Sequence, residues 1–231
     1  MKSLLRSALF GSAILIAPFA LHAETAATPA VAPATFSTQQ LTDGLKSGLG
    51  SIITQALGSG DLTVKAPSAL AKIQAALSKT DNAATATGFS DAFSSAVAKV
   101  SPQAGGLIQG ALKDLNIADA KALLAGGPNA ATTYLQKTAG ASLRAKLLPL
   151  VKQATASSGL ATKGQEMLAL AGPLAGFGGS KAVSDLDGYI CDQVLAQSFA
   201  LIGKGEAAAR ANPALLKDNQ LAQKVFALFK K

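Results

Sequence analysis

The sequence predicts an all-α protein, a compact domain of about eight to ten short helices. Apolar residues recur at three- and four-residue spacing along most of the chain, as in Leu41, Leu45 and Leu49. At most a trace of strand character is found, at residues 62–64. Hydrophobic residues make up 49% of the chain, many of them alanine, and tryptophan is absent. The core is therefore expected to form from helices that approach one another closely.

The chain begins with the features of a secretory signal peptide. Lys2 and Arg6 precede an apolar stretch over residues 8–21, and Ala23 offers a small residue for cleavage. The alternative is a membrane anchor, but the stretch is shorter than the roughly 20 residues that a spanning helix needs. We expect residues 1–23 to be removed, which gives a periplasmic or secreted protein without a transmembrane segment.

Cleavage after Ala23 would remove His22, the one histidine of the chain. The mature protein could then form no Ser-His-Asp triad, no Cys-His pair and no imidazole metal ligand. A single cysteine, Cys191, allows neither an internal disulfide nor a thiolate zinc site. Because Cys191 lies in an apolar helical run, we expect it to be a small buried hydrophobe. These residues predict no metal and no cofactor.

The chain is basic, with 21 lysine and arginine residues against 13 acidic ones. A basic balance can serve an anionic membrane or a nucleic acid. Here the basic residues are scattered singly, except for Lys230-Lys231, and no arginine stripe alternates with aromatic residues. We expect a solvated basic surface and no nucleic-acid partner.

Residues 24–37 alternate alanine, threonine, proline and valine without a helical period, which predicts a disordered leader before a single domain at 38–231. The first helix is expected from Thr38. It carries Gly44 and Gly48, a spacing that permits close helix packing in a soluble chain.

Helices are next expected from Ser68, then over residues 89–100, 107–115 and 117–125. Pro102 and Gly105-Gly106 are expected to separate the second of these from the third. Asn116-x-x-Asp119 resembles a capping box that would open the helix at 117–125.

Five more helices are expected in the second half of the chain. Apolar spacing places them from Gly126-Gly127 to about residue 137, at 142–156 with a kink at Pro149, and at 160–171, 185–209 and 213–229. Residues 172–184 form the longest predicted loop.

The Gly-Gly-Pro segment at residues 126–128 is the first candidate site. Gly126 is expected to end a helix in the left-handed conformation, and Pro128 to take the first position of the next helix. The free amides at that helix start, with Thr132 one turn on, could hold an anion. The lysine of a phosphate-binding loop is absent. A plain helix junction is the alternative interpretation.

Ser184-Asp185-Leu186-Asp187 is the second candidate. Ser184 and Asp187 form a capping-box variant, and both aspartates lie where a helix start favours negative charge. A pair of carboxylates could instead perform acid–base work or hold a hard cation.

The only tyrosines, Tyr134 and Tyr189, each lie one turn into a helix that starts at one of these candidates. A buried phenol needs a hydrogen-bond partner. If the two helix starts meet in space, the partners could be Asp185, Asp187, Thr132 and Arg210.

Several blocks in order resemble a bacterial exported family, domain of unknown function 4197. They are Gly126-Gly127-x-x-Ala130-Ala131-Thr132-x-Tyr134, Asp185-Leu186-Asp187-x-Tyr189-Ile190, Arg210-Ala211-Asn212-Pro213 and Lys224-Val225-Phe226. The resemblance implies a helical envelope or secreted domain without an established activity. Family members tend to carry a run of glutamates before the arginine, whereas this chain has Lys204-Gly205-Glu206 with one acid. A catalytic role for those acids is hard to transfer.

We expect a non-enzymatic envelope module that binds a partner protein or an apolar or anionic ligand. The alternative is an enzyme or metal-binding protein that uses Asp185, Asp187 and Tyr189. A third hypothesis is membrane-surface association through the C-terminal helix, although its apolar face could instead dock on the core. That face consists of Leu221, Val225, Leu228 and Phe229.

Overall fold

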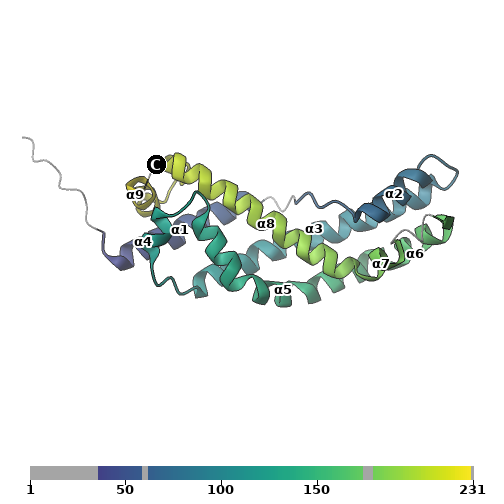
Figure 1. Cartoon of the computed structure of the whole chain (residues 1–231), viewed down its shortest axis with the longest axis horizontal. Coiled ribbons are helices and arrows are strands. Elements are labelled where there is room, and N and C mark those ends of the chain that lie inside the picture. Colours follow the sequence, from purple (N-terminus) through teal and green to yellow (C-terminus); the bar gives the residue numbers. More distant parts are fainter. Residues whose placement is uncertain (1–35, 59–61, 174–178, 230–231) are drawn as a thin grey trace, which may run out of the picture. The chain divides into compact units, whose positions relative to one another are not determined.

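The computed structural model describes residues 36–58, 62–173 and 179–229 (Figure 1). These residues form nine α-helices and a 3₁₀ helix, without a strand, so the all-α prediction is confirmed. The predicted signal peptide and most of the predicted leader lie outside the described residues. The elements are α1 Thr38–Leu57, α2 Ser68–Leu77, α3 Ala83–Asp114, α4 Ala120–Ala125, α5 Ala130–Ser158, α6 Leu160–Leu170, α7 Gly179–Ser184, α8 Leu186–Ala211, η2 Pro213–Leu215 and α9 Gln220–Leu228.

Two predicted helix breaks are wrong. The helix α3 runs without interruption through Pro102 and Gly105-Gly106, and α5 spans the predicted gap at residues 138–141 and includes Pro149. A proline removes one hydrogen bond of the helix, but apolar burial continues on both sides of each proline. On α3 the buried residues on either side are Val100, Ala104, Ile108 and Leu112, and on α5 they are Leu143, Leu147 and Val151.

Two further boundaries differ from the prediction. The helix predicted at 213–229 is divided into η2 and α9, and Asp218 between them has a positive φ of 23°. Asn219 then caps α9, because its side chain accepts a hydrogen bond from the backbone N–H of Ala222 at 3.0 Å. In the predicted loop at 172–184, Gly179–Ser184 forms α7, and residues 174–178 lie outside the described residues.

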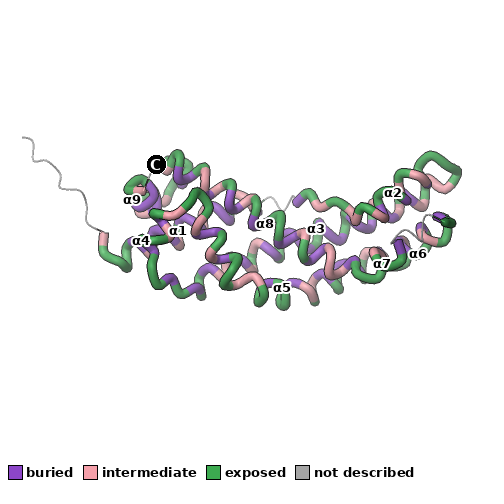
Figure 2. Tube along the Cα trace, viewed as in Figure 1, coloured by how far each residue is buried: buried purple, intermediate pink, exposed green. Residues whose placement is uncertain are grey.

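The three long helices α3, α5 and α8 pack along one another (Figure 1). At one end of α8, α1 contacts α3, α4, α8 and α9, and at the other end α2, α6 and α7 contact one another. Buried positions follow the helix sides that face each other, and exposed positions follow the outer sides (Figure 2). One hydrophobic core in the described residues includes side chains from the helices at both ends of α8.

The helices α1 and α9 meet at the Gly44/Gly48 pair, so the prediction of close packing is confirmed. A Cβ atom on Gly44 would lie 2.5 Å from Cγ2 of Val225, and one on Gly48 would lie 2.7 Å from Cε2 of Phe226. Val225 and Phe226 are buried, whereas Leu228 is 48% exposed. Leu221 and Phe229 are half-buried against the core, so three of the four residues of the predicted apolar face dock on it. None of the described helices combines the length and hydropathy that membrane crossing requires.

Candidate functional site

The turn between α4 and α5 contains the Gly-Gly-Pro segment, and two charged side chains of α8 reach it. Glu206 is fully buried and Arg210 is 8% exposed. Glu206 Oε1 and Arg210 Nη2 form a salt bridge of 2.7 Å. Buried charges are costly unless they are paired and hydrogen-bonded, so the remaining bonds of this pair indicate its role.

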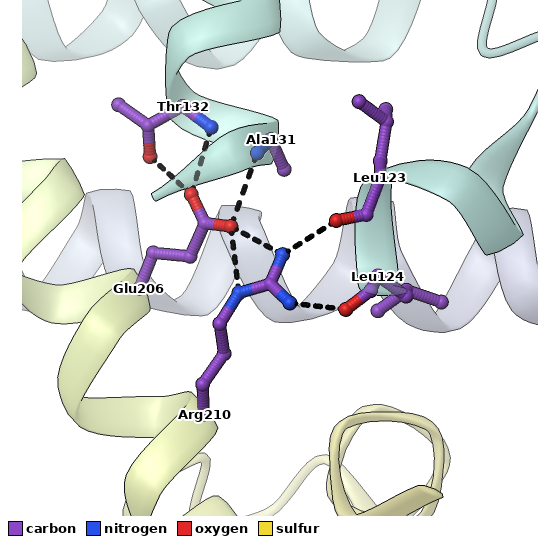
Figure 3. Close-up of polar contacts among 6 residues, drawn as sticks. All are labelled: Leu123, Leu124, Ala131, Thr132, Glu206 and Arg210. Carbon is purple, nitrogen blue, oxygen red and sulfur yellow. Dashed lines mark hydrogen bonds and ion pairs between the residues drawn. The ribbon is translucent and has the colours of Figure 1, made fainter. Parts of the chain in front are cut away.

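Glu206 binds the first turn of α5 (Figure 3). Its Oε1 accepts a hydrogen bond from the backbone N–H of Ala131 at 3.1 Å. Its Oε2 accepts from the backbone N–H and the hydroxyl of Thr132, at 2.7 and 2.6 Å. The N–H groups of a first turn have no intrahelical acceptor, and the side chain of the N-cap residue Asn129 makes no capping bond. A carboxylate from α8 therefore caps α5.

Arg210 binds the last turn of α4. Its Nη1 donates to the carbonyl oxygen of Leu124, and its Nη2 donates to that of Leu123 at 2.9 Å. Its Nε and Nη2 both donate to Oε1 of Glu206, at 3.0 and 2.7 Å. The ring centroid of Phe226 on α9 lies 5.8 Å from the guanidinium carbon, which is within cation–π range.

The pair thus places each charge at the helix end that favours it. A negative group lies at the amino end of α5 and a positive group at the carboxyl end of α4, as the helix dipoles require. In the part of the chain that the structure describes, every buried side-chain nitrogen and oxygen has a partner. The Glu206–Arg210 pair therefore acts as a structural clamp on the turn, and we call it the clamp.

The Gly-Gly-Pro segment itself differs from the prediction in two respects. Gly126 has φ −69° and ψ −166°, so it is extended rather than left-handed. Its Cβ would lie 2.8 Å from the Cβ of Ala130, and this close approach accounts for the glycine. Pro128 precedes the N-cap Asn129 instead of taking the first position of α5, because the turn extends two residues further than expected. A cavity of about 250 Å³ beside the turn includes Gly127 in its lining.

The capping box predicted from Asn116 is also wrong. The N-cap of α4 is Asp119, whose side chain accepts from the backbone N–H of Ala122 at 2.8 Å. The hydroxyl of Tyr134 donates to the backbone carbonyl of Asn116 at 3.0 Å. The helix α4 begins at Ala120, three residues later than the predicted start at Ile117.

The second candidate lies where α7 meets α8. Asp187 Oδ1 accepts a hydrogen bond from the hydroxyl of Thr155 at 2.6 Å, and the hydroxyl of Tyr189 donates to the carbonyl of Lys65 at 2.9 Å. The capping box predicted from Ser184 is wrong, because Ser184 belongs to the last turn of α7. Its hydroxyl donates to the carbonyl of Lys181 at 2.9 Å. Asp185 precedes α8 and makes no capping bond with its side chain.

The two candidates do not meet. Asp187 and Arg210 lie near opposite ends of α8, about 35 Å apart at the rise of an α-helix. One group contains Gly126, Gly127, Thr132 and Arg210, with Tyr134 one turn further along α5, and the other contains Asp185, Asp187 and Tyr189. Neither tyrosine bonds to the side chains proposed for it, since each donates to a backbone carbonyl.

Glu206 was not among the residues that sequence reasoning selected. Two signals could have found it. It is the one acid that this chain keeps before the Arg-x-x-Pro block, and it lies four residues before Arg210, a spacing that puts both side chains on one helix face.

A cavity of about 440 Å³ adjoins the second candidate, between the start of α8 and its neighbours. Thr155 of α5 and Asp187 of α8 lie in its wall with their hydrogen bond. The lining consists of Thr155, Leu160, Ala161, Gln165, Leu168, Ser180, Val183, Ser184, Leu186 and Asp187. Within the described ranges, no three or more histidine, cysteine, aspartate or glutamate residues are grouped so that they could hold a metal ion.

One turn beyond Asp187, α8 carries Cys191 and Asp192. The Arg144 Nε donates to Asp192 Oδ1 at 2.6 Å, and this hydrogen bond, followed by the attraction of the Asp192 charge, raises the pKa of Arg144. Cys191 is buried, and its Sγ lies 3.7 Å from the carbonyl oxygen of Arg144. Burial raises the pKa of the Cys191 thiol, and the nearby Asp192 carboxylate adds to the effect.

The raised pKa of Cys191 predicts a loss of stability in alkali. The folded thiol keeps its proton to higher pH than the unfolded thiol, whose pKa is about 8.5. Its contribution to stability is therefore complete below about pH 8.5 and is lost as the pH rises through the folded pKa. We expect the free energy of unfolding of the wild type to fall relative to Cys191→Ala between pH 8.5 and 10. Urea unfolding under reducing conditions measures both, and parallel pH profiles would contradict the prediction.

The fold and the clamp define the class of protein: an all-helical domain whose helix junction is held by a buried glutamate–arginine pair. The chain belongs to the family described as protein of unknown function (DUF4197), whose model matches residues 36–227. The clamp joins two of the blocks that resembled this family, Gly126–Tyr134 and Arg210–Pro213. Comparison with curated proteins gave no match, and neither did comparison with solved structures.

Proposed function

We propose that this protein is an exported, non-enzymatic binding module of the bacterial envelope, and that it holds a small ligand in the cavity at the start of α8. The observation that carries the proposal is this cavity, whose volume of about 440 Å³ falls within the range of small-molecule sites. Such sites combine an apolar lining with a few fixed polar groups. Here Leu160 and Leu186 supply apolar wall, and the bond from Thr155 fixes Asp187.

Export is supported by the charged start, the short apolar stretch and the small residue at position 23. The family match begins at residue 36, beyond both the predicted signal peptide and most of the predicted leader. Mass spectrometry of the protein recovered from the periplasm or the medium tests this part, and we expect an amino terminus at Glu24.

The geometry favours binding over catalysis. Glu206 and Arg210 are engaged with backbone groups of α4 and α5, and the hydroxyl of Tyr189 is engaged with the carbonyl of Lys65. Asp185, Asp187 and Tyr189, the residues of the enzymatic alternative, thus do not share a network of hydrogen bonds in the described structure. An acid–base pair has to reach one reacting group from both sides, and here the hydroxyl of Tyr189 is directed to a backbone carbonyl instead.

The cavity can be filled to test the proposal. Ala161 lines it from an exposed position on α6, so Ala161→Phe should occupy the space without disturbing the core. Ala145→Phe, at an exposed position on α5 outside the cavity lining, is the matched control. We expect small molecules from an envelope extract to co-elute with the wild type and the control, and to bind Ala161→Phe about tenfold more weakly, a loss of about 1.4 kcal/mol. Equal retention by all three proteins would count against the cavity.

A further inference from the structure

We infer that the cavity at the start of α8 takes an organic cation, a molecule with a protonated amine on an apolar body. This inference rests on the proposed function, because it names the class of ligand for the same cavity. It follows from three features of the lining: its charge, its hydrogen-bonding capacity and its apolar surface.

The charge of the cavity is carried by one residue. Among the described residues that line the cavity, Asp187 is the one charged side chain, and none is a lysine or an arginine. An anionic ligand, one of the two kinds expected from the sequence, would therefore meet a carboxylate without a compensating cation.

Within the described residues, the other acids of α8 pair with arginines, and Asp187 forms no ion pair. Asp192 pairs with Arg144 and Glu206 pairs with Arg210. Among the ion pairs of the described residues, none includes Asp187, whose observed partner is the neutral hydroxyl of Thr155. A partly buried carboxylate without a charged partner gains from the approach of a cation.

The fixed hydrogen bonds of the lining leave acceptors for a ligand. The hydroxyl proton of Ser184 is donated to the carbonyl of Lys181, so its oxygen can only accept from a ligand. Asp187 has a second carboxylate oxygen besides the one that Thr155 binds. An ammonium group has three donors and no acceptor, which matches this set.

The apolar residues of the lining favour a ligand with a hydrocarbon part. Leu160, Leu168, Val183 and Leu186 also line this cavity. Burial of hydrocarbon against such a surface contributes about 0.8 kcal/mol per CH₂ group. A short alkyl chain on the amine would use both parts of the lining.

Three probes of equal length separate the possibilities: hexylammonium, hexanol and hexanoate. Each is titrated into the exported protein and followed by the amide resonances of the lining residues in ¹H–¹⁵N spectra. We expect hexylammonium to bind about tenfold more tightly than hexanol, and hexanoate to bind most weakly. This comparison uses the wild type alone and does not depend on any variant.

Asp187→Asn then removes the charge at nearly constant size, and Asp192→Asn, on the same helix outside the cavity, is the control. We expect Asp187→Asn to abolish the preference for hexylammonium over hexanol and Asp192→Asn to keep it. If hexanol binds as tightly as hexylammonium, or hexanoate binds more tightly, the cation is wrong while the cavity remains a binding site. If no probe shifts the lining resonances, both the cation and the proposed cavity are wrong.

Discussion

Glu206→Gln is expected to lower the free energy of unfolding by about 3–5 kcal/mol, the range for breaking a buried ion pair at one partner. Arg210 would remain buried with its charge uncompensated. The carboxylate accepts hydrogen bonds from Ala131, Thr132 and Arg210 through two oxygens. A glutamine amide has one acceptor oxygen and a donor group in place of the other, so it cannot satisfy the same partners.

Chemical denaturation followed by circular dichroism measures this loss. Asp192→Asn is the matched control, because it neutralises an arginine-paired acid on the same helix in an exposed pair. Exposed ion pairs contribute little to stability, so the control should unfold almost as the wild type does. A Glu206→Gln curve close to that of the control would show that the clamp does not hold the turn.

A double variant, Glu206→Met with Arg210→Met, tests what the clamp binds. Replacement of both partners of a buried ion pair by apolar residues is often neutral. Here it would also leave two N–H groups at the start of α5 and the carbonyl of Leu124 without their partners, while the carbonyl of Leu123 would keep the N–H of Gly126. We therefore expect the double variant to stay at least about 2 kcal/mol less stable than the wild type. If the double variant is as stable as the wild type, the hydrogen bonds from the clamp to α4 and α5 do not contribute to stability.

Helical periodicity located most of the elements but not their breaks. The sequence shows that Pro102 and Pro149 each remove a backbone hydrogen bond, yet it does not show that α3 and α5 bury apolar residues against each other on both sides of those positions. Tertiary burial outweighs the local cost of a proline in both helices. Gly126 is a related case. Its φ of −69° is open to any residue, and the glycine is explained instead by the Cβ of Ala130, which leaves no room for a side chain.

The candidate site shows a different limit. The sequence selected helix starts, and the structure places Glu206 and Arg210 in the last two turns of α8, where their partners are 74 to 87 residues away along the chain. Such contacts have no local signal except the four-residue spacing of the pair. The hypothesis that the two helix starts meet is wrong for a simpler reason, because the length of α8 keeps Asp187 more than about 30 Å from Arg210.

Gly44→Ala is expected to destabilise the protein by about 2 kcal/mol, within the range for overpacking a core. The new Cβ would lie 2.5 Å from Cγ2 and 2.9 Å from Cβ of Val225. Val225 is β-branched and therefore stiff, so α9 would have to move away from α1. The gain in helix propensity on replacing glycine, about 1 kcal/mol, offsets only part of this cost.

Gly50→Ala provides the control on the same helix, because no atom lies within 4 Å of the Cβ position at Gly50. There the propensity gain acts alone, and we expect a stabilisation of about 0.5–1 kcal/mol. Val225→Ala should reduce the cost of Gly44→Ala when the two are combined, since it removes both methyl groups that the new Cβ would meet. Opposite signs for two identical substitutions six residues apart would show that α1 carries Gly44 for the approach of α9. If the two substitutions change the free energy of unfolding equally, α9 can move away from α1 without a loss of stability.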